Sequence, residues 1–155
     1  MTLSKLINIF QNYLQLTKPR IIPLLLITAL GGMLLGAQEI PNLSIILTVL
    51  IAGSLASGGA SSINQYLEHD IDTKMSRTSN RPIAMGKIKP INALVFGIVL
   101  NILSLLLFVI FTNLISGILA ISATLFYIIV YTIILKRSTH QNIVIGGAAG
   151  ALPPI

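Results

Sequence analysis

The chain has 155 residues, of which 54% are hydrophobic and 9% charged, and its mean hydropathy is +0.90. The absence of cysteine excludes a secreted fold held by disulfides, and so short a chain has no polar bulk in which to bury long apolar stretches as a soluble core. The formal net charge of +6 falls in separate loops rather than on one basic face, so no nucleic-acid partner is expected.

The first predicted element is an amphipathic helix over about residues 3–16. Its apolar residues recur at helical spacing, with polar residues between them: Leu3, Leu6, Ile7, Phe10 and Leu14. This pattern predicts a helix that lies on the membrane surface. Pro19 ends it, because proline disfavours a helical conformation in the residue before it.

Four apolar stretches follow, each close to the roughly 20 residues that a membrane-spanning helix needs. They cover about residues 21–38, 43–63, 91–111 and 114–135, and a fifth begins near residue 142 and is cut short at residue 155. The predicted fold class is all-α: a polytopic transmembrane bundle with four full spans and a truncated fifth, forming one membrane domain over residues 1–155. The second stretch is rich in small residues, which predicts a central position in the bundle.

The basic residues indicate the orientation of this bundle. All ten Lys and Arg lie in the N-terminal arm, in the 64–90 loop, or at positions 136 and 137, whereas the alternating loops at 39–42 and 112–113 carry none. Such an asymmetry places the N-terminus and the 64–90 loop in the cytoplasm. The missing Arg- and Ser-rich leader favours a bacterial inner membrane.

Three of the four acidic residues stand together directly after the second apolar stretch. Asn64, Glu68 and Asp72 are spaced i, i+4 and i+8, which puts them on one helical face. Asp70 points away from that face unless the helix unwinds there. Mg²⁺ is commonly held by one or two carboxylates together with substrate phosphates, so Asn64, Glu68 and Asp72 are candidate metal ligands and Asp70 is a further catalytic candidate.

Basic residues follow the acidic ones and complete a candidate diphosphate site. Arg77 and Arg81 are one helical turn apart and could grip phosphate oxygens, with Lys74 as a nearby point charge. The alternative is a solvated loop with local ion pairs, such as Glu68 with Lys74, each contributing about 0–1 kcal/mol.

Two long motifs carry a resemblance to a known family. The run Asn64-x-x-x-Glu68-x-Asp70-x-Asp72-x-x-x-x-Arg77-Thr-x-Asn-Arg81-Pro82 resembles the first acidic motif of the UbiA superfamily of intramembrane prenyltransferases, with Glu68 in place of that motif's first Asp. The stretch from Tyr131 to Pro154, together with residues 16–20, resembles the branch that farnesylates protoheme IX.

The resemblance implies a Mg²⁺-dependent transfer of the farnesyl group of farnesyl diphosphate onto a vinyl group of heme B, giving heme O for heme A biosynthesis. Asn64, Glu68 and Asp72 would hold the metal, and Lys74, Arg77 and Arg81 would neutralise the departing diphosphate. The implied partners are farnesyl diphosphate, heme B and the lipid bilayer, with heme A synthase or a second copy of the chain as further candidates.

Family members carry a second acidic motif, whereas no acidic residue follows Asp72 in this sequence. Either the sequence is a fragment or two copies combine, and a fragment is the favoured interpretation. Other interpretations remain open: an inactive remnant that acts as a membrane or assembly protein, a prenyltransferase for a quinone precursor, or a small transporter. The predicted spans are free of charge, which counts against transport. His69 and His140 are weaker candidates, as heme ligands.

Overall fold

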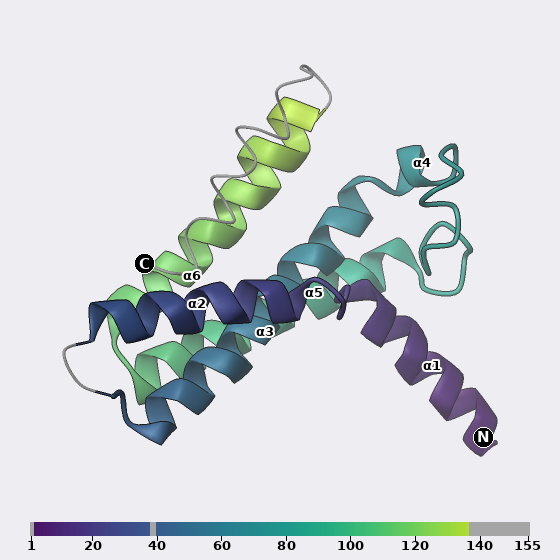
Figure 1. Cartoon of the computed structure of the whole chain (residues 1–155). Coiled ribbons are helices and arrows are strands. Elements are labelled where there is room, and N and C mark those ends of the chain that lie inside the picture. Colours follow the sequence, from purple (N-terminus) through teal and green to yellow (C-terminus); the bar gives the residue numbers. More distant parts are fainter. Residues whose placement is uncertain (1, 38–39, 137–155) are drawn as a thin grey trace.

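The computed structural model describes residues 2–37 and 40–136, and every regular element within those ranges is a helix. Figure 1 shows the helices, which in chain order are α1 (Leu3–Leu16), α2 (Ile22–Gly36), α3 (Leu43–Leu67), α4 (His69–Asp72), α5 (Pro90–Phe111), α6 (Leu114–Leu125) and the π-helix η1 (Phe126–Leu135). The all-α class predicted from sequence is therefore confirmed for the part of the chain that the structure describes.

Three helical stretches are long and apolar enough to cross a membrane: Leu43–Leu67, Pro90–Phe111 and Leu114–Leu135. The last of these combines α6 with η1. The helix α2 is also apolar but has 15 residues, fewer than the roughly 20 that a perpendicular span needs. The predicted fifth stretch lies outside the described residues. The count of four full spans is thus supported for three helices, with α2 as a shorter apolar fourth.

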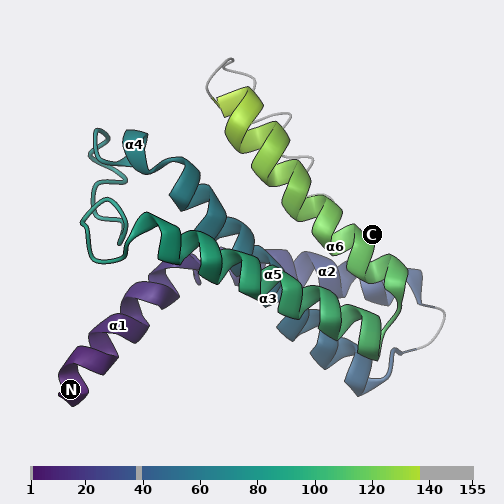
Figure 2. The ribbon, with the colours of Figure 1, turned by 180° about the vertical axis from the view of Figure 1, so that it is seen from behind.

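The helix α3 occupies the centre of the bundle, as its small residues predict. It contacts α1, α2, α5, α6 and η1, and it runs beside α5 in both opposite views (Figures 1 and 2). Two glycines explain the close approach. A Cβ atom on Gly59 would lie 2.7 Å from the carbonyl oxygen of Gly97, and one on Gly97 would lie 2.8 Å from the carbonyl oxygen of Gly59.

Buried hydroxyl groups form hydrogen bonds between α3 and α5. The Ser104 hydroxyl of α5 donates to the carbonyl oxygen of Ala52 in α3 at 2.7 Å, and the Ser62 hydroxyl donates to the carbonyl oxygen of Ala93 at 2.8 Å. Such bonds between apolar helices are formed where lipid offers no alternative partner. They fix the relative height of α3 and α5, and hence the position of the polar residues at the end of α3.

The helix α1 has the predicted bounds and projects away from the bundle (Figure 2). Only its C-terminal end is packed: Leu16 is fully buried in a cluster with Ile83, Ile88 and Ala93, and the Tyr13 ring meets the Phe96 ring edge-on at 5.0 Å. The remaining apolar side chains are exposed, including Leu3 and Phe10. An amphipathic helix with an unpacked apolar face is typical of a membrane-surface helix.

Candidate functional site

The acidic residues lie at the junction between α3 and α4. The backbone N–H of Glu68 donates to the carbonyl oxygen of Asn64 at 3.0 Å, and that of Asp72 donates to Glu68 at 2.9 Å. One-turn spacing therefore continues across the junction, although α3 ends at Leu67. Asn64, Glu68 and Asp72 are 1%, 3% and 3% exposed. The structure thus brings the three predicted side chains together in a buried position; their role as metal ligands stays a prediction.

Arg81 joins both carboxylates. Its Nη1 atom lies 2.8 and 2.6 Å from the two carboxylate oxygens of Asp72 and 3.4 Å from Oε2 of Glu68. The loop is held in place by Thr78, whose hydroxyl donates to the carbonyl oxygen of Asp72 at 3.2 Å and whose carbonyl accepts the N–H of Arg81 at 3.0 Å. The structure thus brings Arg81 to the acidic residues, and its role in binding diphosphate stays a prediction.

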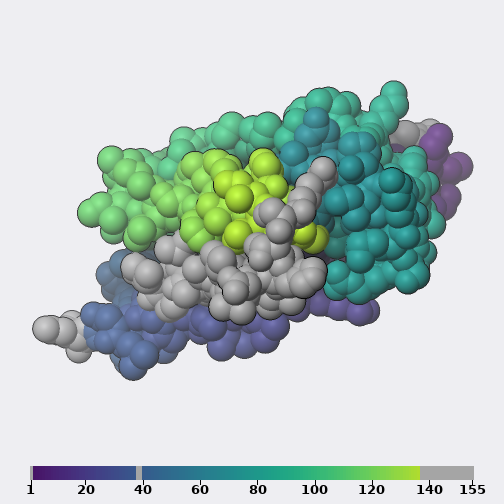
Figure 3. Space-filling model, turned by 90° about the horizontal axis from the view of Figure 1, so that it is seen from above, coloured from purple at the N-terminus to yellow at the C-terminus, as the bar shows by residue number. Residues whose placement is uncertain are grey.

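Two lysines complete the cluster from other parts of the chain. Lys136 Nζ lies 2.5 Å from Oε1 of Glu68, and Lys18 Nζ lies 3.4 Å from Oδ1 of Asn64. In Figure 3 the end of the described chain, drawn yellow-green, lies against the teal surface of the α3–α5 connection. Lys18 has a left-handed backbone (φ 52°), which bends the chain between α1 and α2 and is uncommon for a residue with a side chain.

The cluster carries an excess of positive charge. Burial, reinforced by the nearby Arg81 guanidinium, lowers the pKa of Lys18 to about 8, so most of this lysine is still protonated at pH 7. Among the described residues, Lys18, Arg81 and Lys136 lie beside the two carboxylates of Glu68 and Asp72. Partly buried cations that outnumber their acidic partners attract an anion.

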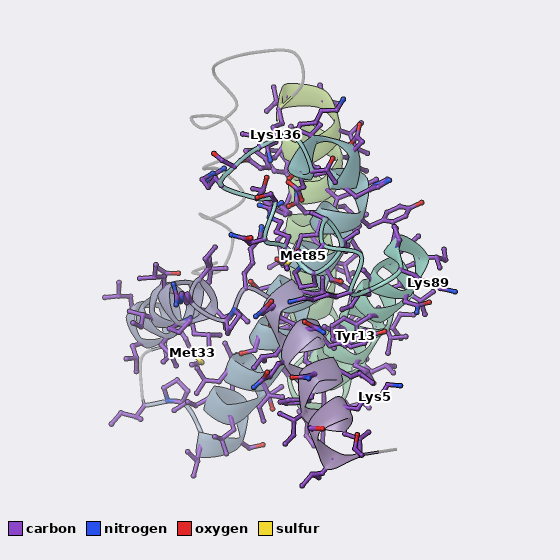
Figure 4. All side chains as sticks on the ribbon, turned by 90° about the vertical axis from the view of Figure 1, so that its right-hand side faces the viewer. Lys5, Tyr13, Met33, Met85, Lys89 and Lys136 are labelled. Carbon is purple, nitrogen blue, oxygen red and sulfur yellow. The ribbon has the colours of Figure 1, made fainter. Side chains whose placement is uncertain are left out.

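The π-helix η1 brings residues from the other side of the bundle to this cluster. Hydrogen bonds of the i→i+5 type widen such a helix, which is rare in proteins and frequent at functional sites. The Thr132 hydroxyl donates to the carbonyl oxygen of Tyr127, five residues earlier, at 3.0 Å. The same hydroxyl accepts a hydrogen bond from Nδ2 of Asn64 at 3.0 Å. Lys136 follows directly after η1, and Figure 4 shows it at one end of the molecule.

A cavity of about 850 Å³ opens beside the cluster, among α2, α3, α5 and α6. Lys18 and Thr17 line it at the end near the cluster, and apolar side chains such as Leu25, Ala56 and Leu119 line its length. Ser61 also lines it, and within residues 2–37 and 40–136 the buried hydroxyl of Ser61 has no hydrogen-bond partner. The cavity therefore fits a ligand with a long apolar tail and a polar anionic head.

Some predicted site residues lie outside this cluster. Asp70, Lys74 and Arg77 are exposed, and neither Lys74 nor Arg77 forms one of the ion pairs to Glu68 or Asp72. The exposed His69 ring lies 2.7 Å from the carbonyl oxygen of Tyr66, whereas His140 lies outside the described residues. Within the ranges that the structure describes, no three His, Cys, Asp or Glu side chains gather as a metal site.

Sequence analysis missed Lys18, Lys136 and Thr132 as members of the cluster. The charges of the two lysines had been explained by membrane orientation alone. A signal was present, because Lys18 stands in the 16–20 motif and the other two stand in the motif that begins at Tyr131. A basic or hydroxyl residue within such a motif, at the end of an apolar stretch, indicates a functional site as well as the orientation of the helix in the membrane.

The structure thus combines apolar helices long enough to cross a membrane with a cavity that has a positively charged cluster at one end. The model of the UbiA prenyltransferase family matches residues 25–155, and the chain belongs to this family. No solved structure matches the chain.

Curated relatives are similar along nearly all of this sequence. A protoheme IX farnesyltransferase from Streptomyces coelicolor is 52% identical over 141 residues, which are 91% of this chain and 45% of the relative. The enzyme of that name from Trichodesmium erythraeum is 49% identical over 152 residues, 98% of this chain and 46% of the relative. The one from Synechocystis is 49% identical over 145 residues, 94% and 46%. The chain thus spans about half the length of the curated relatives it matches.

Proposed function

We propose that this chain takes part in the transfer of a farnesyl group from farnesyl diphosphate to a vinyl group of heme B, which gives heme O. The observation that carries the proposal is the cluster of three partly buried cations and two buried carboxylates beside an apolar cavity of about 850 Å³. A diphosphate head fits the cluster and a farnesyl tail fits the cavity. The names of the relatives favour heme over a quinone precursor as the acceptor.

The donor set fits Mg²⁺. Glu68 and Asp72 present two carboxylates one helical turn apart, and the amide oxygen of Asn64 lies on the same helical face. Mg²⁺ keeps several waters and is bound by one or two carboxylates plus phosphate oxygens, so a larger set of acidic residues is not needed. When bound, the ion would neutralise negative charge on the diphosphate. Asp70 is exposed and is a weaker candidate for this role.

The remaining residues of the cluster would stabilise the leaving group. Ionisation of an allylic diphosphate breaks a C–O bond and leaves the electron pair on the diphosphate, so negative charge develops there. Arg81, Lys136 and Lys18 are already positioned by the ion pairs and hydrogen bond that they make with Glu68, Asp72 and Asn64. Preorganised charges of this kind lower the barrier, because they need little rearrangement during the reaction. Lys74 and Arg77, being exposed, would act at longer range.

The wall of the cavity suits a reactive intermediate. Aliphatic side chains form a large part of it, among them Leu25, Leu26, Val49 and Leu119. Aliphatic side chains have no lone pair with which to capture a carbocation, and they exclude water from it. We place the enzyme in the bacterial inner membrane, with the cluster on the cytoplasmic side, because the basic residues stand at that end of the apolar helices.

The proposal is tested in cells that lack their own heme O synthase. Heme is extracted from cells expressing the chain, from cells expressing Asp72→Asn, and from cells expressing Lys74→Gln, and is analysed by chromatography and mass spectrometry. We expect heme O with the parent chain, little or none with Asp72→Asn, and a smaller loss with Lys74→Gln. Membrane-inserted protein without any heme O would contradict transfer by this chain alone, and a prenylated quinone precursor in the same extracts would change the acceptor.

A further inference from the structure

A second hollow lies beside α1 and shares no lining residue with the charged cluster. It measures about 330 Å³ and is formed by α1 and the start of α5. Its lining residues are Ile9, Asn12 and Tyr13 from α1, and Lys87, Ile88, Lys89 and Asn92 from the other side. We propose that this hollow binds the phosphate headgroup of an anionic phospholipid.

The charge of the hollow suits a phosphate. Lys87 and Lys89 are exposed. Among residues 2–37 and 40–136, no acidic residue lines the hollow and neither lysine forms an ion pair. Lys5 stands one helical turn before Ile9 on the same face of α1, and Figure 4 shows Lys5, Tyr13 and Lys89 on one side of the molecule. Basic pockets of this kind between helices bind acidic lipid headgroups.

The level of the hollow relative to the membrane suits a lipid rather than a soluble ligand. Lys89 is the residue before α5, and α5 is a candidate span of 22 residues, about 33 Å long at 1.5 Å per residue. The hydrocarbon layer is about 30 Å thick, so the start of α5 lies at the level of the headgroups. The apolar side chains of α1 are exposed beside it, with Phe10 at 68% and Leu14 at 45%, and would meet the acyl chains.

The walls of the hollow are held in place without a ligand. Ile88 is 5% exposed and packs with Leu16 and Ala93, and Tyr13 contacts Phe96. The backbone N–H of Lys87 donates to the carbonyl oxygen of Pro82 at 2.9 Å. A preformed site loses little conformational freedom on binding, which favours affinity.

The chain has no tryptophan, which allows a direct binding test. Ile9→Trp places one fluorophore in the hollow of the full chain in detergent, and the protein is titrated with brominated phosphatidylglycerol or brominated phosphatidylcholine. We expect saturable quenching by the anionic lipid and much weaker quenching by the neutral one. Adding Lys87→Gln and Lys89→Gln removes two interfacial charges and lowers the apparent affinity by about fivefold for each lysine.

A matched control removes the same charge elsewhere: Arg20→Gln with Lys74→Gln, both exposed and outside the hollow. This control should keep the affinity within about twofold, and all variants should keep their helical circular dichroism, because the replaced residues are exposed. Equal quenching by both lipids, or equal losses in the two double variants, would overturn the proposal. Displacement by glycerol phosphate at the concentration of the lipid would also overturn it, because the ligand would then be a soluble phosphate.

Discussion

Arg81 determines the state of the cluster in the absence of substrate. Its guanidinium spans the carboxylates of Asp72 and Glu68 at 2.6–3.4 Å, which are the groups that would hold Mg²⁺. A metal ion alone must displace this ion pair, whereas a metal ion that arrives with diphosphate offers Arg81 a new anionic partner. We therefore expect metal and diphosphate to bind together rather than one after the other.

The replacement Arg81→Gln tests this competition. Without diphosphate, the variant should bind Mn²⁺, a paramagnetic substitute for Mg²⁺, about tenfold more tightly than the parent, because one charged competitor is removed. Electron paramagnetic resonance of free and bound Mn²⁺ measures the change. Arg77→Gln is the control, since Arg77 is exposed and forms no ion pair with Glu68 or Asp72. Unchanged or weaker Mn²⁺ binding by Arg81→Gln would contradict the competition.

Lys18 gives diphosphate binding a dependence on pH. Its pKa is lowered to about 8 by burial and by Arg81, with Lys136 lowering it further and Glu68 and Asp72 opposing the shift. A lysine binds an anion in its protonated form, so affinity should fall as the pH rises through about 8 and the charge is lost. Titrations with inorganic diphosphate between pH 7 and 9.5 measure this loss.

The control for this titration is Lys18→Arg, which keeps a positive charge throughout the same range. Because titration of the diphosphate itself affects both proteins equally, the difference between the two pH profiles reports Lys18. Parallel profiles would show that Lys18 does not contribute its charge to the site.

At the level of the helices, the contact between α3 and α5 should tolerate no added atom. A Cβ atom on Gly59 would meet the side-chain amide of Asn101 and would lie 2.7 Å from the carbonyl oxygen of Gly97. Gly59→Ala is expected to lower the free energy of unfolding by about 1–3 kcal/mol through overpacking, as measured by thermal unfolding in detergent. Gly31→Ala in α2 is the matched control, since no atom of the described part of the chain lies within 4 Å of the added atom. Equal unfolding temperatures for the two variants would contradict the tight crossing.

Sequence predicted the helices closely, because the long apolar stretches end at polar, charged or proline residues. The predicted 114–135 stretch matches Leu114–Leu135, and the predicted helix over 3–16 matches α1. The π-helix was not predicted, because apolar periodicity does not distinguish i→i+4 from i→i+5 hydrogen bonding over ten residues. Its consequence, the contact between Thr132 and Asn64, depends on tertiary packing.

The candidate site was predicted in part, and the limit was the reach of local spacing. The i, i+4, i+8 pattern correctly placed Asn64, Glu68 and Asp72 on one face. Spacing could not show which basic residues return to that face, because Lys18 lies 46 residues from Asn64 and Lys136 lies 68 residues from Glu68. Such distant pairs follow from helix packing rather than from the neighbourhood of a residue in the sequence.

For the whole molecule, the proposed function assigns the two parts of the substrate to separate places. The cluster at the end of α3 would bind the diphosphate, whereas the cavity would bind the prenyl chain. Ala120→Phe places a large side chain in the cavity and should weaken binding of a farnesyl diphosphate analogue by about tenfold or more through lost tail burial. Its affinity for inorganic diphosphate should stay within about twofold. Equal losses for both ligands would show that the cavity does not hold the tail.

The most direct test of the account measures how the purified chain binds farnesyl thiodiphosphate with and without Mg²⁺. In this analogue, sulfur replaces the oxygen that joins the farnesyl carbon to the diphosphate. Calorimetry should show binding that requires Mg²⁺ and that weakens by about tenfold to a hundredfold in Glu68→Gln and in Asp72→Asn, because each variant loses a charged ligand. Asp70→Asn, which changes an exposed carboxylate, should bind nearly as well as the parent chain. Binding that is independent of Mg²⁺ and equal in all three variants would contradict the assignment of this cluster as the diphosphate site.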